Sequence, residues 1–209
     1  MPGVFQRQSL KTQLLTSHLI LVALMVVVMT GAIISFLRLG RSIDRIFRDN
    51  YKSVVTAQNM KDALERMDSS ALFLLAGQTR RARSQYETNE KKFARAYYIE
   101  AHNITEPGEQ EMADDIGRMF AEYQKSIEKL LYANPPMQTQ NARTYYFKML
   151  EPTFVRLKSR AQDVLDINQA AIVRADERAK AEARRSSLIS VAVTIGALLL
   201  AVFLAIHIQ

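Results

Sequence analysis

Residues 14–37 read LLTSHLILVALMVVVMTGAIISFL, and residues 188–208 read LISVAVTIGALLLAVFLAIHI. Neither stretch contains an acidic residue, a lysine or an arginine. A helix needs roughly 20 apolar residues to cross the hydrocarbon core of a bilayer, so each stretch is long enough. No stretch between them meets this condition. The pattern predicts two transmembrane helices that hold residues 38–187 on one side of a membrane.

The segment between the two stretches is polar and mixed in charge. It contains all 21 acidic residues and every lysine and arginine except Arg7 and Lys11, and the whole chain has a formal net charge of +7. Bases interspersed with acids are typical of a solvated helical surface, whereas nucleic-acid interfaces group their cations in patches. We therefore expect no nucleic-acid partner. The chain has no cysteine, which excludes disulfides and thiol nucleophiles.

The first apolar stretch is longer than the roughly 7 to 15 residues typical of a signal-peptide core, and no small-residue cleavage site follows it. We interpret it as an uncleaved signal anchor, with residues 1–13 cytoplasmic and residues 38–187 extracytoplasmic. The charges beside the spans point the other way. The parts of the middle segment that adjoin the two apolar stretches contain Arg38, Arg41, Arg45, Arg48, Arg184 and Arg185. The positive-inside rule alone would place the middle segment in the cytoplasm, but long translocated domains override this rule.

Helix-breaking residues in the middle segment fall in three clusters, at positions 77–79, 105–108 and 134–136. They divide the segment into four parts, each with apolar residues three or four positions apart, as on one face of a helix. Short connections make neighbouring helices antiparallel. We predict an all-α fold, an antiparallel up-down-up-down four-helix bundle whose first and fourth helices continue into the two transmembrane helices. Pro152 should kink the fourth helix or mark a turn that restarts there.

Three polar residues lie on the apolar stripe of the first helix. Asn50, Lys61 and Asp68 occupy positions that should face inward. Burying an unpaired polar or charged group is costly, so each must reach solvent, a partner or a ligand. We take the three as candidate ligand-binding residues, with the edge of the stripe and solvent contact as the alternative.

A second candidate ligand site lies at the end of the bundle formed by the first and third connections. The prediction brings Arg80, Arg81 and Arg83 close to Arg143, Tyr145 and Tyr146. Arginine binds carboxylates and phosphates through paired hydrogen bonds, and tyrosine rings can close over the ligand. This cluster predicts a site for a small anion, and the alternative is a solvated basic tip.

The lower part of the fourth helix has the composition of a helix–helix seam. Asn168, Ile172, Ala175 and Ala179 lie on one face, and alanine permits close helix approach. A single polar residue in such a seam fixes its register. We expect a homodimer that packs along these residues. The alternative is that alanine is here only as the best helix former.

No motif of enzyme chemistry is present. The sequence has no glycine-rich phosphate loop, nucleophile elbow, HExxH or supported carboxylate pair. We expect no catalytic residue, no metal site and no cofactor in this segment. His102 is interpreted as a helix-terminal residue, and Glu100, Glu106 and Glu109 as ordinary surface acids.

The predicted signal anchor is followed by RSIDRIFRDNYKSVVTAQNMKDALERMDSSALFLLAGQ (41–78), and NQAAIVRADERAKAEARR (168–185) precedes the second span. The segments EAHNITEPGEQE (100–111) and YYFKMLEP (145–152) lie between these two. In these features the chain resembles the input region of bacterial sensor histidine kinases. Chemoreceptors share this architecture.

The resemblance implies a multi-pass homodimer in the inner membrane with its bundle in the periplasm. A HAMP linker and a histidine kinase domain, which uses ATP and magnesium and phosphorylates a response regulator, would follow the second span. The kinase activity belongs to that part and not to these residues. We expect the chain to relay an extracytoplasmic cue by helix movement. The candidate cue is an unidentified small molecule, with anions as the candidate class. A chemoreceptor and a non-signalling membrane scaffold are the alternatives.

Overall fold

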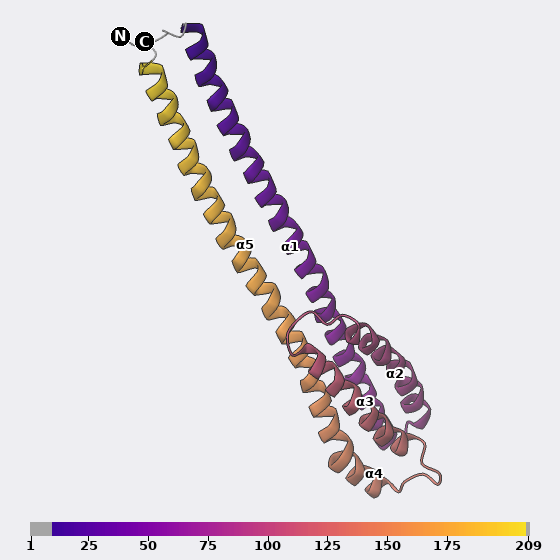
Figure 1. Ribbon diagram of the computed structural model, residues 1–209. Helices are drawn as coiled ribbons and strands as arrows, with labels where there is room; N and C mark the ends of the chain where they lie inside the picture. Colours follow the sequence, from indigo (N-terminus) through magenta and orange to yellow (C-terminus); the bar gives the residue numbers. More distant parts are fainter. Residues whose placement is uncertain (1–9, 208–209) are drawn as a thin grey trace, which may run out of the picture. The chain divides into compact units, whose positions relative to one another are not determined.

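The computed structural model describes residues 10–207, except for the side chains at positions 10–14, 17, 38–39, 41–46, 204–205 and 207. Over that range the chain forms five α-helices and one π-helical turn, with no strand (Figure 1). The elements are α1 (Leu10–Leu75), α2 (Thr79–Ala101), α3 (Glu109–Leu131), α4 (Thr139–Tyr145), the π-helix η1 (Tyr146–Leu150) and α5 (Glu151–His207). The all-α prediction is confirmed. Most of the predicted segment 1–13, and Ile208 at the end of the predicted second span, lie outside the described residues.

The chain divides into two compact units. The first, which we call the terminal unit, consists of residues 1–44 and 175–209. The second, the core unit, consists of residues 45–174. Helices α1 and α5 each contribute residues to both units.

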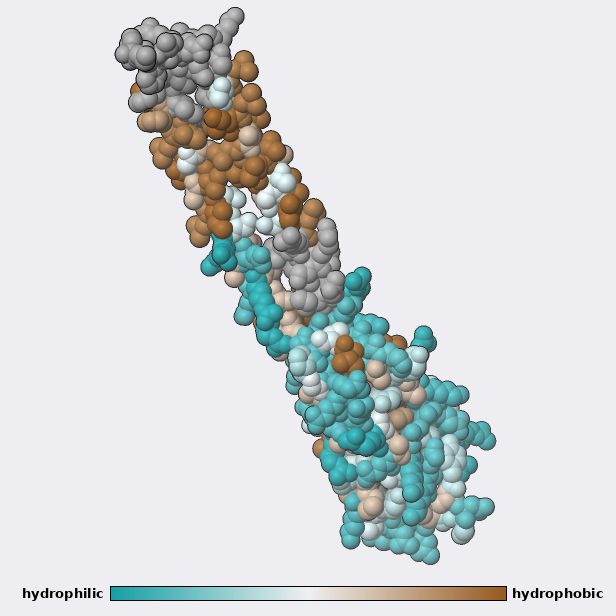
Figure 2. All heavy atoms as spheres, in the orientation of Figure 1, coloured by the Kyte–Doolittle hydropathy of each residue, from teal (hydrophilic) through white to brown (hydrophobic). Residues whose placement is uncertain are grey.

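Two helices are long and apolar enough to cross a membrane. One span is His18–Leu37, with a mean hydropathy of 2.8, and the other lies within Thr139–Phe203 and reaches 2.3. Their apolar side chains are exposed, as at Phe36 (77%) and Leu188 (71%). Figure 2 shows the most hydrophobic surface gathered on these helices, while the core unit is mostly hydrophilic outside. An apolar helix surface suits contact with lipid.

The core unit has one continuous apolar interior. Figure 1 shows α1, α2, α3 and α5 side by side in this unit. Each of these four helices supplies side chains that are fully buried: Met60, Leu64, Met67, Phe93, Ile116, Tyr123, Ile127, Leu131 and Leu157. The rings of Phe93 and Phe120 stack with their centroids 4.0 Å apart and join α2 to α3. The three- and four-residue spacing of these positions explains why each segment forms a helix with one face in the core.

The predicted breaker clusters end the helices. Gly77 follows α1 with a φ of +81°, a left-handed conformation that glycine adopts without a steric penalty. The N–H of Gln78 donates to the carbonyl of Phe73 and the N–H of Gly77 to that of Leu74, both at 2.9 Å. These two bonds form a Schellman motif, which satisfies the last carbonyls of the helix. Gly108 has a φ of +88° and stands directly before α3.

Pro152 lies in an unbroken helical stretch, and the π-turn lies just before it. In η1 the N–H of Glu151 donates to the carbonyl of Tyr146, five residues back. Proline has no N–H, and its ring collides with the carbonyl four residues earlier. A π-turn adds one residue to the turn and is a common way to absorb such a conflict. The predicted disturbance at Pro152 thus takes the form of a π-turn ahead of it.

We expect Gly77→Ala to lower the free energy of unfolding of the core unit by about 1 kcal/mol, because a Cβ disfavours left-handed backbone. The measurement is chemical denaturation of the full chain in detergent, followed by circular dichroism. The matched control is Gln78→Ala, since Gln78 is exposed and has a φ of −90°. Equal effects of the two substitutions would contradict the role given to Gly77.

Candidate functional site

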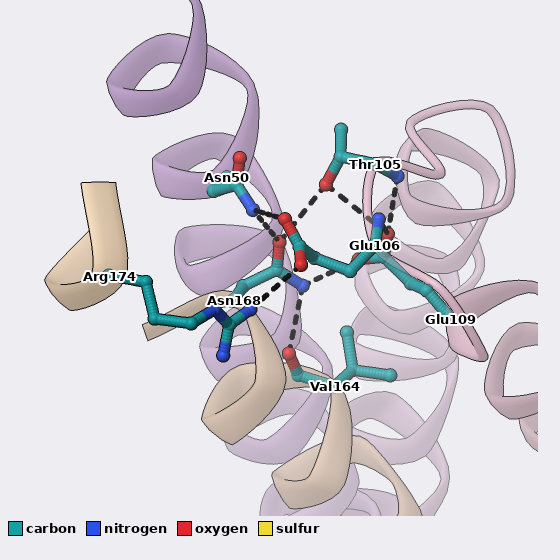
Figure 3. Close-up of polar contacts among 7 residues, drawn as sticks. All are labelled: Asn50, Thr105, Glu106, Glu109, Val164, Asn168 and Arg174. Atoms are coloured by element: carbon teal, nitrogen blue, oxygen red, sulfur yellow. Dashed lines mark hydrogen bonds and ion pairs between the residues drawn. The ribbon is translucent and has the colours of Figure 1, made fainter. Parts of the chain in front are cut away.

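A buried polar network connects α1, the loop between α2 and α3, the start of α3 and α5 (Figure 3). All of its residues belong to the core unit. At its centre lies Asn168 of α5, whose side chain is 0% exposed. Its amide oxygen accepts from Asn50 Nδ2 at 3.1 Å and from Thr105 Oγ1 at 3.3 Å. Its amide nitrogen donates to Glu109 Oε1 at 2.5 Å and to the carbonyl of Val164 at 2.9 Å.

Glu109 is the first residue of α3 and is also 0% exposed. Besides the bond from Asn168, its carboxylate accepts from the backbone N–H of Thr105 and, at 2.9 Å, from that of Glu106. The pKa of Glu109 is lowered: burial pushes it up, but the bonds from Asn168, Thr105 and Glu106 outweigh burial. Glu109 is therefore an ionised carboxylate at neutral pH. It closes the loop onto the start of α3.

The outer side of the network carries an ion pair. Asn50 of α1, 3% exposed, donates to Glu106 Oε1 at 3.0 Å. The other oxygen of Glu106 accepts from Arg174 Nη2 at 2.9 Å. Figure 3 shows the loop carboxylate lying between α1 and α5 in this way. The loop that contains Glu106 is thus bonded to both helices.

Asn103 ties the loop to α1 a second time. Its Nδ2 donates to the carbonyl of Asp49 at 2.8 Å and to Ser53 Oγ at 2.9 Å. Ser53 itself is fully buried. The loop between α2 and α3 is therefore hydrogen-bonded to α1 through Asn103 as well as through Glu106.

Glu100, near the end of α2, is the second buried acid. It is 0% exposed, and neither carboxyl oxygen has a hydrogen-bond partner of good geometry. Burial, followed by repulsion from the neighbouring Glu109, raises the pKa of Glu100 to about 8, while Ser53 and Lys52 act weakly in the opposite direction. Glu100 is mostly a neutral acid at pH 7. Because both side chains are buried, the pair can bind and release a proton but cannot contact a substrate.

Two expectations need correction here. Glu100 and Glu109 are not surface acids, since both are completely buried, and Glu106 is half-buried in an ion pair. Asn168 is not the polar residue of a dimer seam, because its side chain is buried within its own chain and its amide is fully occupied there. The helices whose register Asn168 can fix are therefore the packed helices of its own core unit. Of the predicted candidates, only Asn50 and Asn168 meet in this network.

The other two polar residues of the α1 stripe have partners within the chain. Asp68 is 8% exposed and accepts from the hydroxyl of Tyr146 at 2.9 Å. Burial raises the pKa of Asp68, and the bond from Tyr146 lowers it in part. Lys61 is half-buried and donates to the side chain of Gln162 on α5. All three stripe residues thus find protein partners, and ligand binding by them stays a prediction.

The structure gives the residues of the predicted anion clamp separate surroundings. Tyr146 is buried, and its hydroxyl donates to Asp68. Lys129 lies over the ring of Tyr145, with its Nζ 5.3 Å from the ring centroid. Arg81 stacks on Phe73, 3.9 Å to the centroid, while Arg83 donates to the carbonyl of Leu131 at 3.1 Å. The remaining members, Arg80 and Arg143, are exposed. The clamp stays a prediction, and Tyr146 is already engaged in the core.

The rest of the predicted seam lies at the border of the two units. Ile172 and Ala179 are half-buried, and Ala175 is 6% exposed. Dimer packing along these three residues stays a prediction.

A groove of about 400 Å³ lies between α1 and α2 on the core unit. Its lining includes Arg66 of α1 and Lys92 and Arg95 of α2, three cations without an ion pair among the described residues. Asp62 is the acid in this lining. The groove therefore carries a positive balance.

We expect Asn168→Ala to lower the free energy of unfolding by about 1 to 3 kcal/mol, because it removes one buried hydrogen-bond partner from Asn50 and one from Glu109. Denaturation of the full chain in detergent measures the change. The control is Gln169→Ala, on the exposed neighbouring position of the same helix. A loss no larger than that of the control would show that the network contributes little.

Comparison with known proteins finds no family model, no curated protein and no solved structure that matches the chain.

Proposed function

We propose that the chain is the input module of a transmembrane sensor, which relays an extracytoplasmic cue to the other side of the membrane by helix movement. The observation that carries this proposal is the bond between Asn50 of α1 and Asn168 of α5. Each of these helices also contains one of the two candidate membrane spans. A change in the network therefore acts on two helices that continue toward the spans.

The proposed architecture is an antiparallel up-down-up-down four-helix bundle with α1 and α5 as its long members. The short turns at Gly77 and Gly108 and the single shared core support it. Signalling proteins commonly move packed helices by about 1–2 Å. A cue produces such a shift only if it interacts differently with the two arrangements. An uninterrupted helix is suited to carry the shift, because its hydrogen-bonded backbone resists compression.

The resemblance to sensor histidine kinases supplies the output side of the proposal. The protein would be a homodimer in the bacterial inner membrane, packed along Ile172, Ala175 and Ala179. A HAMP linker and a kinase domain using ATP and magnesium would follow, with a response regulator as the final partner. An anionic small molecule fits the cationic groove that contains Arg66, Lys92 and Arg95 better than the dispersed arginines of the predicted clamp.

The first test joins residues 1–209 to the cytoplasmic part of a well-characterised receptor kinase and measures autophosphorylation in membrane vesicles. We expect Asn50→Ala and Ala175→Phe each to change basal activity by about fivefold or more, the lower range of allosteric coupling. Tyr51→Ala is the matched control, since Tyr51 is 60% exposed on α1. Activity equal to wild type in all three variants, at equal membrane levels, would contradict the relay.

The second test concerns topology. We expect an alkaline phosphatase fused after Pro135 to be active, because that enzyme works only outside the cytoplasm, and a β-galactosidase fused there to be inactive. The opposite pair of results would place residues 38–187 in the cytoplasm, as the flanking arginines alone suggest.

A further inference from the structure

We propose that Glu100 and Glu109 together bind a single proton and that release of this proton is a cue to which the module responds. The inference rests on the proposed function, since it names the stimulus of the same network. It treats the proton as the ligand and the buried acid pair as its binding site.

The geometry of the pair allows only one charge. Both side chains are 0% exposed, and their carboxyls are close enough to repel each other. Glu109 accepts bonds from Asn168, Thr105 and Glu106, all of which favour its ionised form. Glu100 has none of these donors. Two buried carboxylates side by side are strongly unfavourable, so the single proton stays with Glu100.

The charged and titratable groups around the pair do not offset a second negative charge. From α1, Lys52 is exposed and only weakly favours ionisation of Glu100, and Ser53 is neutral. From the loop, Glu106 is a third acid, and its oxygens are occupied by Asn50 and Arg174. From α5, Asn168 is neutral, and Arg174 is engaged by Glu106.

The direction of the response follows from these positions. The pKa of Glu100 is raised from its ordinary value of 4.5 to about 8, so its contribution to the stability of the folded network is full below pH 4.5, falls as pH rises above that value and is lost by about pH 8. In the folded network Glu100 itself releases its proton as pH rises through about 8. The pKa of Glu109 is lowered, so its contribution is lost only in acid, below the usual range of a glutamate. Between neutral pH and pH 9 the change in protonation of the pair occurs at Glu100.

The pair is connected to both long helices. Glu109 is bonded to Asn168 of α5, and Asn168 to Asn50 of α1. When Glu100 gives its proton to the solvent, repulsion drives Glu109 and the start of α3 away from Glu100. This movement strains the hydrogen bond that Glu109 accepts from Asn168. Proton release thus separates the start of α3 from the end of α2, and the position of α3 relative to α5 changes with it.

The experiment measures the change in position between α3 and α5 in the full chain in lipid nanodiscs. The chain has no cysteine, so spin labels can be placed at Gln110→Cys on α3 and Gln169→Cys on α5, both exposed positions. Electron spin resonance then gives the distance distribution from pH 6 to pH 9. We expect one distribution at pH 6 and a second, different one that grows between pH 7 and pH 9. In Glu100→Gln, which keeps the shape of the neutral acid, we expect the pH 6 distribution throughout.

Two control variants separate this pair from other ionisable side chains. Asp68→Asn removes the other buried carboxyl whose pKa is raised, and His102→Gln removes the histidine at the end of α2. Both should keep the transition. The inference is overturned by a wild-type distribution that does not change, by a transition that persists in Glu100→Gln, or by its loss in either control.

Infrared difference spectra give a second readout that does not depend on labels. We expect the carbonyl band of one buried protonated carboxyl to disappear between pH 6 and pH 9 in wild type and to be missing in Glu100→Gln. A band that persists to pH 9 would overturn the inference.

The receptor-kinase fusion separates this question from signalling. A distance change without altered kinase activity supports the proton site and contradicts the relay, whereas pH-independent distances with a working relay exclude the proton as its cue.

Discussion

The amide of Asn168 is the contact on which one whole end of the core unit depends. It bridges Asn50 of α1, Thr105 of the loop and Glu109 of α3. The bonds to Asn50 and Glu109 are buried, and the bond from Thr105 is partly buried. A buried amide cannot exchange a lost partner for water, so each bond constrains the others. The position of the loop, the start of α3 and the spacing of α1 from α5 are therefore set together.

An apolar cluster would hold the same helices without the cost of burying charge. Replacing buried ionic groups by packed apolar ones is often neutral or stabilising, so stability alone does not explain the pair Glu100 and Glu109. An apolar core also packs in more than one register, whereas directed bonds permit one. The same bonds make the arrangement depend on protonation, which an apolar cluster would not. Specific register and sensitivity to a proton thus have one physical origin here.

Much of the fold follows from sequence patterns, and most of the site does not. Gly77 and Gly108 mark turns because their left-handed backbone conformation disfavours other residues, and the apolar spacing marks each helix. Spacing says which face is buried but not which residues of different helices meet. Asn168 was recognisable as a register-fixing residue, yet the sequence could not tell a partner within the chain from one in a second copy. Tyr146 was likewise predicted as part of an anion clamp, and only the packing of α1 against it shows that its hydroxyl donates to Asp68.

Glu100 did carry a signal in the sequence. Tyr86 and Phe93 lie seven residues apart on the buried stripe of α2, and Glu100 is the next position in that series. An acid in such a position is either bonded or neutral. Asp68 shows the first case, because Tyr146 donates to it. Glu100 has no donor, and its neighbour is another acid. It is this missing donor, which only the three-dimensional arrangement reveals, that distinguishes a proton-binding acid from a structural one.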